Sequence, residues 1–348
     1  MNGGAERERA QPRSYLWIAA LLALLALHAW IFKNGADLRV FELAGSRALH
    51  GEELYRLDEA MPFKYTPIAA LLLSPFSLLP HQASHLLWNA LSVLAILRLM
   101  RWSSGGRMPL WPSLLVLALQ ALFIHRLFAL GQIDALLLWL MVESEIRVER
   151  PLISGLLWAL ACLFKPPFLI FLLVAAAFRQ WKRIGALAAF GALGLLAGWR
   201  ELPAFCELLA VTTQPMLCGD PENQGIVGIA CHYFGSAQAA IVPAAAIAFA
   251  LLSRKRLAVA SCFFLSAFFS PLCWETNLIA LIPLAYVVAQ ARFIWARATL
   301  FAAIAVNLLN YDLLGRDLFF RVLEYRHYGL AALLVAITAA SVDRLPQE

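Results

Sequence analysis

A few polar residues interrupt the long apolar runs of this sequence, and they are the ones that could carry chemistry. Asp37 follows the first long run, Gly131-Gln132-Ile133-Asp134 opens a later one, and Lys165 separates two short ones. Carboxylates and ammonium groups carry proton transfer and anion binding in proteins. At membrane depth such groups are costly, so they usually mark a functional cavity.

The other candidate positions lie in short motifs near the ends of apolar runs. These motifs are Phe63-Lys64-Tyr65-Thr66-Pro67, Asn223-Gln224-Gly225 and Ser270-Pro271-Leu272-Cys273-Trp274-Glu275-Thr276-Asn277. A simpler interpretation exists for Lys165 and Glu275, because long charged side chains can reach interfacial water without any functional role. For Asp37 the alternative is the N-cap of an amphipathic interfacial helix over residues 38–49, whose apolar residues recur at helical spacing.

The elements that must position these residues are transmembrane helices. Of the 348 residues, 62% are hydrophobic and only 14% are charged, whereas a soluble domain carries about 25% charged residues. The chain lacks the polar surface of a water-soluble globule, so we predict an all-α, polytopic transmembrane helix bundle. A nucleic-acid-binding domain is excluded, since cytoplasmic Arg and Lys residues explain the net charge of +6.

About 20 apolar residues cross a bilayer as a helix. The candidate spans are 14–33, 83–101, 109–125, 130–143, 151–164, 166–178, 184–200, 236–252, 257–273, 276–291, 297–310 and 328–342. One further apolar segment, 66–80, is short and is broken by Pro67, Pro75 and Pro80. Whether this segment crosses the membrane decides the sidedness of everything after it.

The distribution of Lys and Arg settles the sidedness through the positive-inside rule. If 66–80 does not cross, 17 of the 28 basic residues lie inside and the other 11 outside; if it crosses, 9 lie inside and 19 outside. We therefore predict 12 spans with 66–80 as a half-inserted outer helix. The cytoplasmic tails are then 1–13 and 343–348, and a single transmembrane domain occupies 14–342.

This topology concentrates polar sequence on the extracytoplasmic face. It leaves three long loops outside, 34–65, 201–235 and 311–327. The segments on either side of Lys165 are too short for ordinary spans, so they either tilt or form a re-entrant hairpin facing a polar cavity. Lys165 is then expected at the floor of an outward-facing cavity.

The cysteines and the cofactor-binding motifs give little information about function. Cys218 and Cys231 lie in the outer loop 201–235, where a disulfide between them is possible. The sequence has no cysteine or histidine pattern with zinc spacing, no phosphate-binding loop and no dinucleotide motif, so we expect no metal and no nucleotide donor. A divalent cation held by Asp37 is conceivable, but no second outer carboxylate is obvious as its partner.

The order of the motifs resembles a known family. An aspartate after the first span is followed by Gly51-x-x-Leu-Tyr55, Phe63-x-Tyr-x-Pro-x-Ala69, Gly-Gln-x-Asp, Lys-Pro, Asn-Gln and a late Ser-Pro-x-x-Trp. This pattern, over roughly residues 14–290, is similar to that of the bacterial α-1,2-mannosyltransferase-like enzymes of glycosyltransferase family 87. These enzymes have the GT-C fold and use polyprenyl-phosphate-linked sugars.

The resemblance implies an inverting transfer of a hexose such as mannose, or of a pentose, from a polyprenyl phosphate to a hydroxyl of a lipid or glycan acceptor. It places the enzyme in the bacterial inner membrane with its active site outside. By the resemblance Asp37 is the general base. The residues expected to bind the donor phosphate are Lys165, Arg126 and Lys64, and those expected to bind substrate are Tyr65, Gln132, Asn223, Gln224, Trp274, Glu275 and Asn277.

The sequence also departs from the family. Glu275-Thr276-Asn277 stands where histidines often follow the late tryptophan, and no arginine follows Asn223-Gln224. These changes leave the sugar and the acceptor open. A lipid-carrier flippase or membrane transporter is the alternative function, although the two halves of the chain show no corresponding broken segments. A structural membrane subunit would leave the positions of Asp37 and Lys165 unexplained.

The predicted topology is testable by cysteine labelling. We expect Gly51→Cys and Pro221→Cys to react with a membrane-impermeant thiol reagent added outside intact cells, and Ser104→Cys to remain unlabelled. The unsubstituted protein gives the background from the native cysteines. Labelling of Ser104→Cys without labelling of Pro221→Cys would contradict the 12-span topology and the outer active site.

Overall fold

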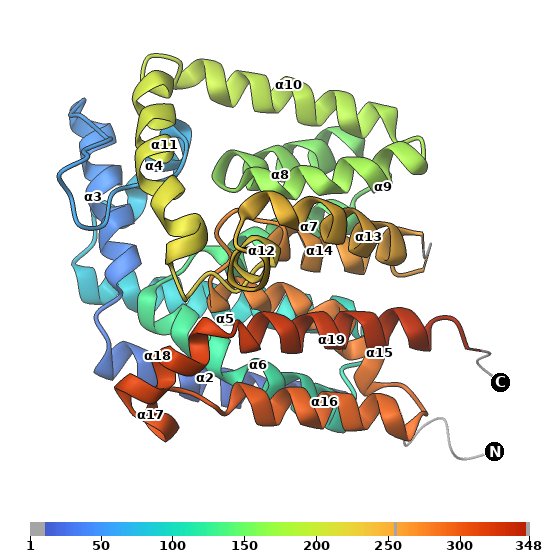
Figure 1. The fold of residues 1–348 in the computed structure, drawn as a ribbon. Coiled ribbons are helices and arrows are strands. Elements are labelled where there is room, and N and C mark those ends of the chain that lie inside the picture. The colour runs from blue at the N-terminus through green and yellow to red at the C-terminus, as the bar shows by residue number, and fades with distance from the viewer. Residues whose placement is uncertain (1–10, 254–255, 346–348) are drawn as a thin grey trace. The chain divides into compact units, whose positions relative to one another are not determined.

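The computed structural model describes residues 11–253 and 256–345. Within these residues the chain forms α-helices and short 3-10 helices, and no strand (Figure 1). The prediction of an all-α fold is confirmed. Most of the two predicted cytoplasmic tails, 1–10 and 346–348, and the basic pair at 254–255 lie outside the described residues.

The chain divides into two compact units, each of which is described by itself. Unit 1 comprises Met1–Leu25, Ile96–His125 and Met216–Glu348, and unit 2 comprises Ala26–Ala95 and Arg126–Pro215. Four helices contribute residues to both units: α2 (Gln11–Phe32), α5 (His81–Ser103), α6 (Leu110–Leu130) and α11 (Leu202–Gly219). That 14–342 acts as a single domain stays a prediction.

Unit 2 is built around pairs of neighbouring helices. Its own elements are α3 (Ala36–His50), α4 (Pro67–Ser77), α7 (Asp134–Ile146), α8 (Pro151–Phe164), η1 (Pro166–Ile170), α9 (Phe171–Ala177) and α10 (Trp181–Ala197). Helix α8 packs against α10 and α7, and α3 packs against α4 (Figure 1). The contact between α8 and α10 is close because a Cβ at Gly155 would stand 2.5 Å from the Cβ of Ala186.

Unit 1 centres on the last long helix. Its own elements are α12 (Ile226–Phe234), η2 (Ala237–Ala240), α13 (Ile241–Leu252), α14 (Ala258–Phe268), η3 (Glu275–Leu281), α15 (Ile282–Ala289), α16 (Ile294–Asn307), α17 (Tyr311–Leu314), α18 (Arg316–Glu324) and α19 (His327–Val342). Helix α19 packs against α16 and α15 (Figure 1). Polar side chains find partners in this core: Tyr286 donates to the Ser113 hydroxyl at 2.8 Å, and Asn307 donates to the Leu119 carbonyl at 2.9 Å.

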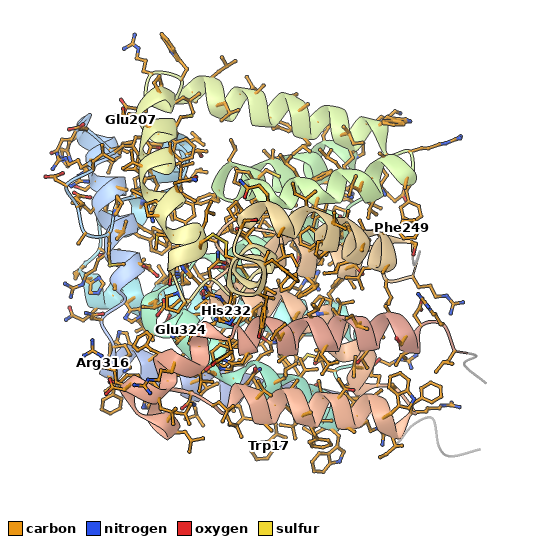
Figure 2. The ribbon with its side chains drawn as sticks, viewed as in Figure 1. Trp17, Glu207, His232, Phe249, Arg316 and Glu324 are labelled. Carbon is orange, nitrogen blue, oxygen red and sulfur yellow. A yellow bond between two sulfur atoms is a disulfide. The ribbon has the colours of Figure 1, made fainter. Side chains whose placement is uncertain are left out.

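Each predicted apolar segment is helical, with bounds that differ by a few residues, which confirms the segments as helices. The predicted outer loops are helical in part as well: 201–235 contains α11 and α12, and 311–327 contains α17 and α18. Among the described residues, three helical stretches are long and apolar enough to cross a membrane, namely Ser14–Phe32, His81–Ser103 and Leu110–Leu130, and the other apolar helices there are shorter. Large apolar side chains point away from their helices, as Figure 2 shows for Trp17 and Phe249, which are 65% and 77% exposed. Such surfaces suit lipid contact. The number of crossings stays a prediction.

Helix α4 corresponds to the predicted half-inserted segment 66–80. Its 11 residues extend about 16 Å at 1.5 Å per residue, roughly half of the 30 Å hydrocarbon core of a bilayer. Pro67 begins the helix at a position where its missing N–H costs nothing, and Thr66 holds the entry by donating to the Leu163 carbonyl at 2.6 Å. The length agrees with half-insertion.

Helix α3 corresponds to the predicted amphipathic helix. It is bounded by Gly35 and Gly51, both in the left-handed conformation, with φ of 57° and 67°. Its apolar face packs on protein, since Leu38, Phe41 and Ala44 are buried, and a Cβ at its Gly45 would stand 2.7 Å from the Ser74 Cα of α4. The face is narrower than predicted, because the Leu49 side chain at the end of α3 is exposed.

The turn after α6 fixes the start of α3 through a glycine. Gly131 has φ of +72°, and a Cβ there would stand 2.6 Å from the Leu38 Cβ. We expect Gly131→Ala to lower the free energy of unfolding by about 1–2 kcal/mol for the left-handed backbone and by about 1–3 kcal/mol more for the overpacking.

The matched control is Gly51→Ala, where φ is +67° but a Cβ would meet nothing within 4 Å. It carries the backbone cost alone. Thermal unfolding in detergent measures both variants, and equal melting temperatures would contradict the close contact between Gly131 and Leu38.

Candidate active site

Asp37 lies in the first turn of α3, not at its N-cap. The cap position is Gly35, whose N–H donates to the Ala129 carbonyl at 3.1 Å, so the backbone enters the helix without help from an aspartate side chain. The Asp37 carboxylate instead accepts a short hydrogen bond from the Gln132 amide. The N-cap interpretation of Asp37 is therefore wrong, and its carboxylate faces the turn after α6.

Gln132 and Asp134 occupy that turn, and the protein holds them in place. Gly131 reverses the chain after α6, and the Gln132 carbonyl accepts a hydrogen bond from the Trp88 indole at 3.2 Å. Asp134 then begins α7 with 6% of its surface exposed. Both side chains are thus fixed by a turn that has little freedom to move.

Lys165 lies at the break between α8 and η1. Since Pro166 follows it, Lys165 is restricted to extended backbone, and its φ and ψ are −132° and 100°. The break is held from the far side because the Trp158 indole donates to the Phe168 carbonyl at 2.9 Å. The Lys165 ammonium donates to an Asp134 carboxylate oxygen at 2.6 Å, and its side chain is 24% exposed.

Tyr65 adds an aromatic wall to this group. Its ring lies 5.4 Å from that of Phe41, 5.6 Å from Phe63 and 6.0 Å from Phe164, measured between ring centroids. Removal from water, together with the nearby carboxylates of Asp134 and Asp37, raises the pKa of the Tyr65 hydroxyl well above its usual value. Tyr65 therefore stays a neutral phenol beside two carboxylates.

The electrostatics make Asp37 a stronger base than an ordinary aspartate. Partial burial raises the pKa of Asp37 to about 6, and the Asp134 carboxylate adds to the rise, whereas Lys165, the Gln132 amide and Arg126 oppose it. A carboxylate with this pKa is ionised at neutral pH and accepts a proton more readily than one with a pKa near 4.

Arg126 and Lys64 are the other two cations that the sequence predicts to bind the donor phosphate. Arg126 is half-buried in the last turns of α6, near enough to Asp37 to stabilise its ionised form. Lys64 is half-buried and precedes Tyr65 in the chain. We define the catalytic cluster as Asp37, Gln132, Asp134, Lys165, Arg126 and Tyr65, all of which belong to unit 2.

Asn223 and Gln224 belong to unit 1 and are fully buried there. The Asn223 amide donates to the Pro271 carbonyl at 2.9 Å and accepts from the Cys273 N–H at 3.0 Å. The Gln224 amide donates to the Pro221 carbonyl at 2.8 Å. These main-chain contacts give both residues a role in holding the loop together, and their substrate-binding role stays a prediction.

The late motif lies beside this loop in unit 1. Trp274 donates through its indole to Asp220 at 3.4 Å, and its N–H donates to the Asn277 side chain at 2.9 Å. Glu275 is 2% exposed at the start of η3. A Cys218–Cys231 disulfide, with Cα atoms 5.2 Å apart, closes the loop next to these residues. The sequence leaves open whether these two cysteines pair.

The site residues predicted from the sequence do not include Asp134, although it belongs to the catalytic cluster. Its signal was present, since the Gly-Gln-x-Asp motif places a carboxylate at the start of an apolar helix, but its partner Lys165 is 31 positions away in the chain. The sequence offers no obvious second carboxylate for Asp37, whereas in the structure Asp134 lies near enough for its charge to raise the Asp37 pKa. No group of three or more His, Cys, Asp or Glu side chains fit to hold a metal occurs within 11–253 and 256–345.

The family model of glycosyltransferase family 87 matches residues 63–274, more than half of the chain. The match includes Lys64, Tyr65, Arg126, Gln132, Lys165, Asn223, Gln224 and Trp274. It begins after Asp37 and ends just before Glu275. The family resemblance inferred from the order of the motifs is therefore confirmed.

Two curated proteins are similar to this chain. One is the polyprenol-phosphate-mannose-dependent alpha-(1-2)-phosphatidylinositol mannoside mannosyltransferase of Mycobacterium tuberculosis, 26% identical over 220 residues. The other is the polyprenol-phosphate-mannose-dependent alpha-(1-2)-phosphatidylinositol pentamannoside mannosyltransferase of Mycolicibacterium smegmatis, 29% identical over 235 residues.

The two alignments cover 53% and 60% of this chain and 51% and 54% of the relatives. The chain thus spans about half the length of the curated relatives it matches. No solved structure matches the chain.

The catalytic cluster predicts opposite pKa shifts for two substitutions. We expect Asp134→Asn to lower the pKa of Asp37, because it removes a neighbouring negative charge and leaves the positive charge of Lys165 uncompensated. We expect Arg126→Met to raise it, because a positive charge that lowers the Asp37 pKa is lost while the Lys165–Asp134 ion pair is kept. Carbon-13 NMR of labelled aspartate carboxyls over pH 4–8 measures both shifts, and shifts of the same sign would contradict the cluster.

Proposed function

Because the chain belongs to glycosyltransferase family 87, we propose that it transfers mannose from a polyprenyl-phosphate carrier to an acceptor hydroxyl. Both similar proteins are named for their dependence on polyprenol-phosphate-mannose, which favours mannose over the other hexoses and the pentoses that the sequence leaves open. In this proposal the enzyme is a 12-span protein of the bacterial inner membrane with both termini cytoplasmic, and it acts on the outer face.

The observation that carries the proposal is the arrangement of the Asp37 carboxylate, which the Gln132 amide holds in place, together with the Lys165–Asp134 ion pair of the same cluster. The acceptor oxygen attacks the anomeric carbon, and its proton passes to the Asp37 carboxylate. The bond between the anomeric carbon and the phosphate oxygen breaks, and the phosphate leaves with the electron pair. One such displacement inverts the configuration at the anomeric carbon.

Lys165 and Arg126 are the groups we assign to the leaving phosphate, with Lys64 as a further candidate. An ammonium has three N–H donors, and Asp134 accepts one bond from Lys165. The remaining donor capacity and the 24% exposure of the side chain suit contact with a phosphate oxygen. Such contacts strengthen as charge develops on the leaving group, so they lower the barrier as well as bind the donor.

Gln132 is best described as a residue that positions Asp37 by donating to its carboxylate. Tyr65 presents a neutral phenol next to Asp37 and Asp134, where a sugar hydroxyl could exchange hydrogen bonds with it. We keep Asn223, Gln224, Trp274, Glu275 and Asn277 as substrate-binding candidates that belong to unit 1.

Asp37→Asn tests the general base. Asparagine keeps the shape and can still accept the Gln132 hydrogen bond, but it cannot accept a proton at neutral pH. We expect the transfer of labelled mannose by purified protein in detergent to fall by about 10²–10⁴-fold. In the unsubstituted enzyme kcat/KM should fall about tenfold per pH unit below the Asp37 pKa of about 6, because protonation removes the base.

The control for this variant is Glu149→Gln, which neutralises an exposed carboxylate of unit 2 outside the catalytic cluster and should leave transfer unchanged. Transfer in detergent needs no closed vesicle, so activity there also separates a transferase from a transporter. Near-normal turnover by Asp37→Asn would contradict its role as a base.

Lys165→Arg and a neutral double variant test the phosphate contact. Lys165→Met alone leaves the buried Asp134 carboxylate unpaired, which destabilises a protein, so the pair is best neutralised together as Lys165→Met with Asp134→Asn. We expect the double variant to fold but to lose most transfer, and Lys165→Arg to retain part of it, because a cation remains in a different geometry. Transfer at the wild-type rate by a well-folded double variant would contradict the contact between Lys165 and the phosphate. The phosphate would then be assigned to Arg126 or Lys64.

A further inference from the structure

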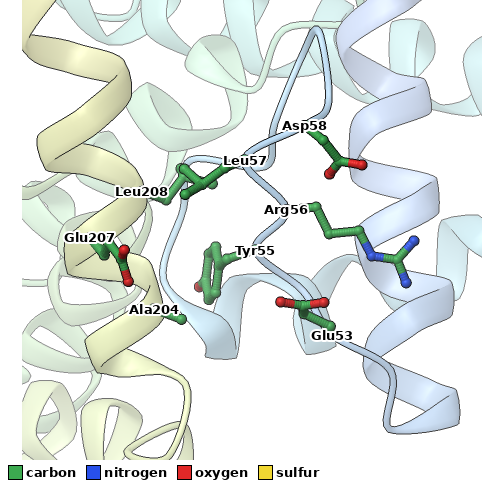
Figure 3. Close-up of a pocket in the computed structure, with 8 residues that line it drawn as sticks. All are labelled: Glu53, Tyr55, Arg56, Leu57, Asp58, Ala204, Glu207 and Leu208. Atoms are coloured by element: carbon green, nitrogen blue, oxygen red, sulfur yellow. The ribbon is translucent and has the colours of Figure 1, made fainter.

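Unit 2 contains a cavity of about 590 Å³ that none of the catalytic-cluster residues lines. Residues 53–58 of the loop after α3 form one side, and α11 forms the other (Figure 3). The lining residues that matter here are Glu53, Tyr55, Arg56, Asp58, Ala204 and Glu207. The volume lies in the range of about 300–1,000 Å³ that is typical of small-molecule sites.

The cavity is preformed because its loop is anchored at several points. Tyr55 is 4% exposed, its ring packs between those of Phe63 and Phe205, and its hydroxyl donates to the Tyr65 carbonyl at 2.7 Å. The buried Arg47 of α3 makes an ion pair with Glu59, at the end of the loop. A loop held in this way loses little further conformational entropy on binding a ligand.

The lining suits an uncharged ligand that is rich in hydroxyl groups. Glu53, Asp58 and Glu207 supply carboxylate oxygens that accept hydrogen bonds from hydroxyls, and Arg56 supplies N–H donors. Tyr55 adds an aromatic ring, and burial raises its pKa, so the phenol is neutral. Three carboxylates against one guanidinium disfavour a phosphate-bearing ligand, which would be repelled.

The cavity is also tied to the catalytic cluster within the same unit. Tyr55 lines the cavity and donates to the main chain of Tyr65, and the Tyr65 phenol lies near enough to Asp37 and Asp134 to be affected by both charges. One hydrogen bond, from the Tyr55 hydroxyl to the Tyr65 carbonyl, therefore joins the wall of the cavity to the segment that carries the Tyr65 phenol.

We propose that this cavity binds an uncharged saccharide of the acceptor, and so orients the acceptor toward Asp37. The proposal rests on the proposed function in so far as it assigns the ligand to the acceptor. It differs from the acceptors in the relatives' names, which carry a phosphoinositide. Under the predicted topology both the loop and α11 lie on the outer face, where such a saccharide would be presented.

Binding and transfer are measured separately. Titration calorimetry of the purified full chain in detergent uses methyl α-D-mannopyranoside as the uncharged probe and mannose 6-phosphate as its charged counterpart. We expect substitutions in the cavity to weaken binding of the uncharged probe and to leave binding of the charged one, which the cations of the catalytic cluster can take up, unchanged. Glu207→Gln removes one charged hydrogen-bond acceptor and should weaken binding of the uncharged probe about tenfold.

Ala204→Trp fills the cavity and keeps every carboxylate, so it should abolish binding of the uncharged probe while leaving the melting temperature unchanged. Glu149→Gln, a carboxylate variant outside the cavity, should bind both probes as the unsubstituted protein does. In the transfer assay the two cavity variants should raise the KM for the acceptor at least tenfold and leave the KM for the donor unchanged.

The two proposals fail in different ways. Uncharged-probe binding that both cavity variants weaken, in a protein without transferase activity, would support the saccharide site and refute the proposed function. Transfer with an unchanged acceptor KM in both variants, or binding of the uncharged probe that neither cavity variant weakens, would overturn the saccharide site and leave the proposed function standing.

Discussion

The positions of the catalytic-cluster residues depend on the ion pair of Asp134, because a buried carboxylate must be paired. Asp134 is 6% exposed and forms an ion pair of 2.6 Å with Lys165. Loss of either partner would leave the other charge uncompensated in a poorly solvated place, which costs several kcal/mol. The pair therefore joins the start of α7 to the break after α8. The hydrogen bond from Gln132 to Asp37 extends the same constraint to α3.

The polar groups meet because each of them lies where a helix starts or stops. Gly131 ends α6 in the left-handed conformation, and Pro166 keeps Lys165 extended after α8. Gly35, which is also in the left-handed conformation, precedes the first turn of α3, where Asp37 lies. Helix ends have main-chain groups without intrahelical partners, so side chains and carbonyls of neighbouring segments are drawn to them, as the contacts of Trp88 with Gln132 and of Gly35 with Ala129 show.

Much of this could be predicted from the sequence because the signals are local. Apolar runs, prolines and glycines predict the boundaries of the apolar helices within a few residues. The polar residues that interrupt those runs include Asp37, Gln132, Asp134 and Lys165. The Cys218–Cys231 disulfide could be named only as one possibility, because Cys206 lies in the same outer loop and no local pattern selects the pair.

Contacts between distant segments could not be predicted in the same way. The N-cap interpretation of Asp37 used only its neighbours in sequence, whereas its partner Gln132 lies 95 positions away. From the sequence Asn223 and Gln224 are equally well explained as ligand-binding amides. Only the fold shows that their side chains accept main-chain hydrogen bonds, from Cys273 and from Gly329 of α19. Which helices pack together depends on the whole fold, so no local pattern contains it.

The charge balance of the cluster explains why a raised pKa at Asp37 suits the proposed chemistry. Asp37 and Asp134 carry two negative charges, and Lys165 and Arg126 carry two positive ones, so the cluster is neutral while Asp37 is ionised. A sugar phosphodiester adds one negative charge, and the phosphate that it leaves behind adds a second. Protonation of Asp37 removes a negative charge while the second phosphate charge develops, which limits the repulsion between the two groups. A carboxylate with an ordinary pKa would accept that proton less readily, whereas one raised further would already be protonated at neutral pH.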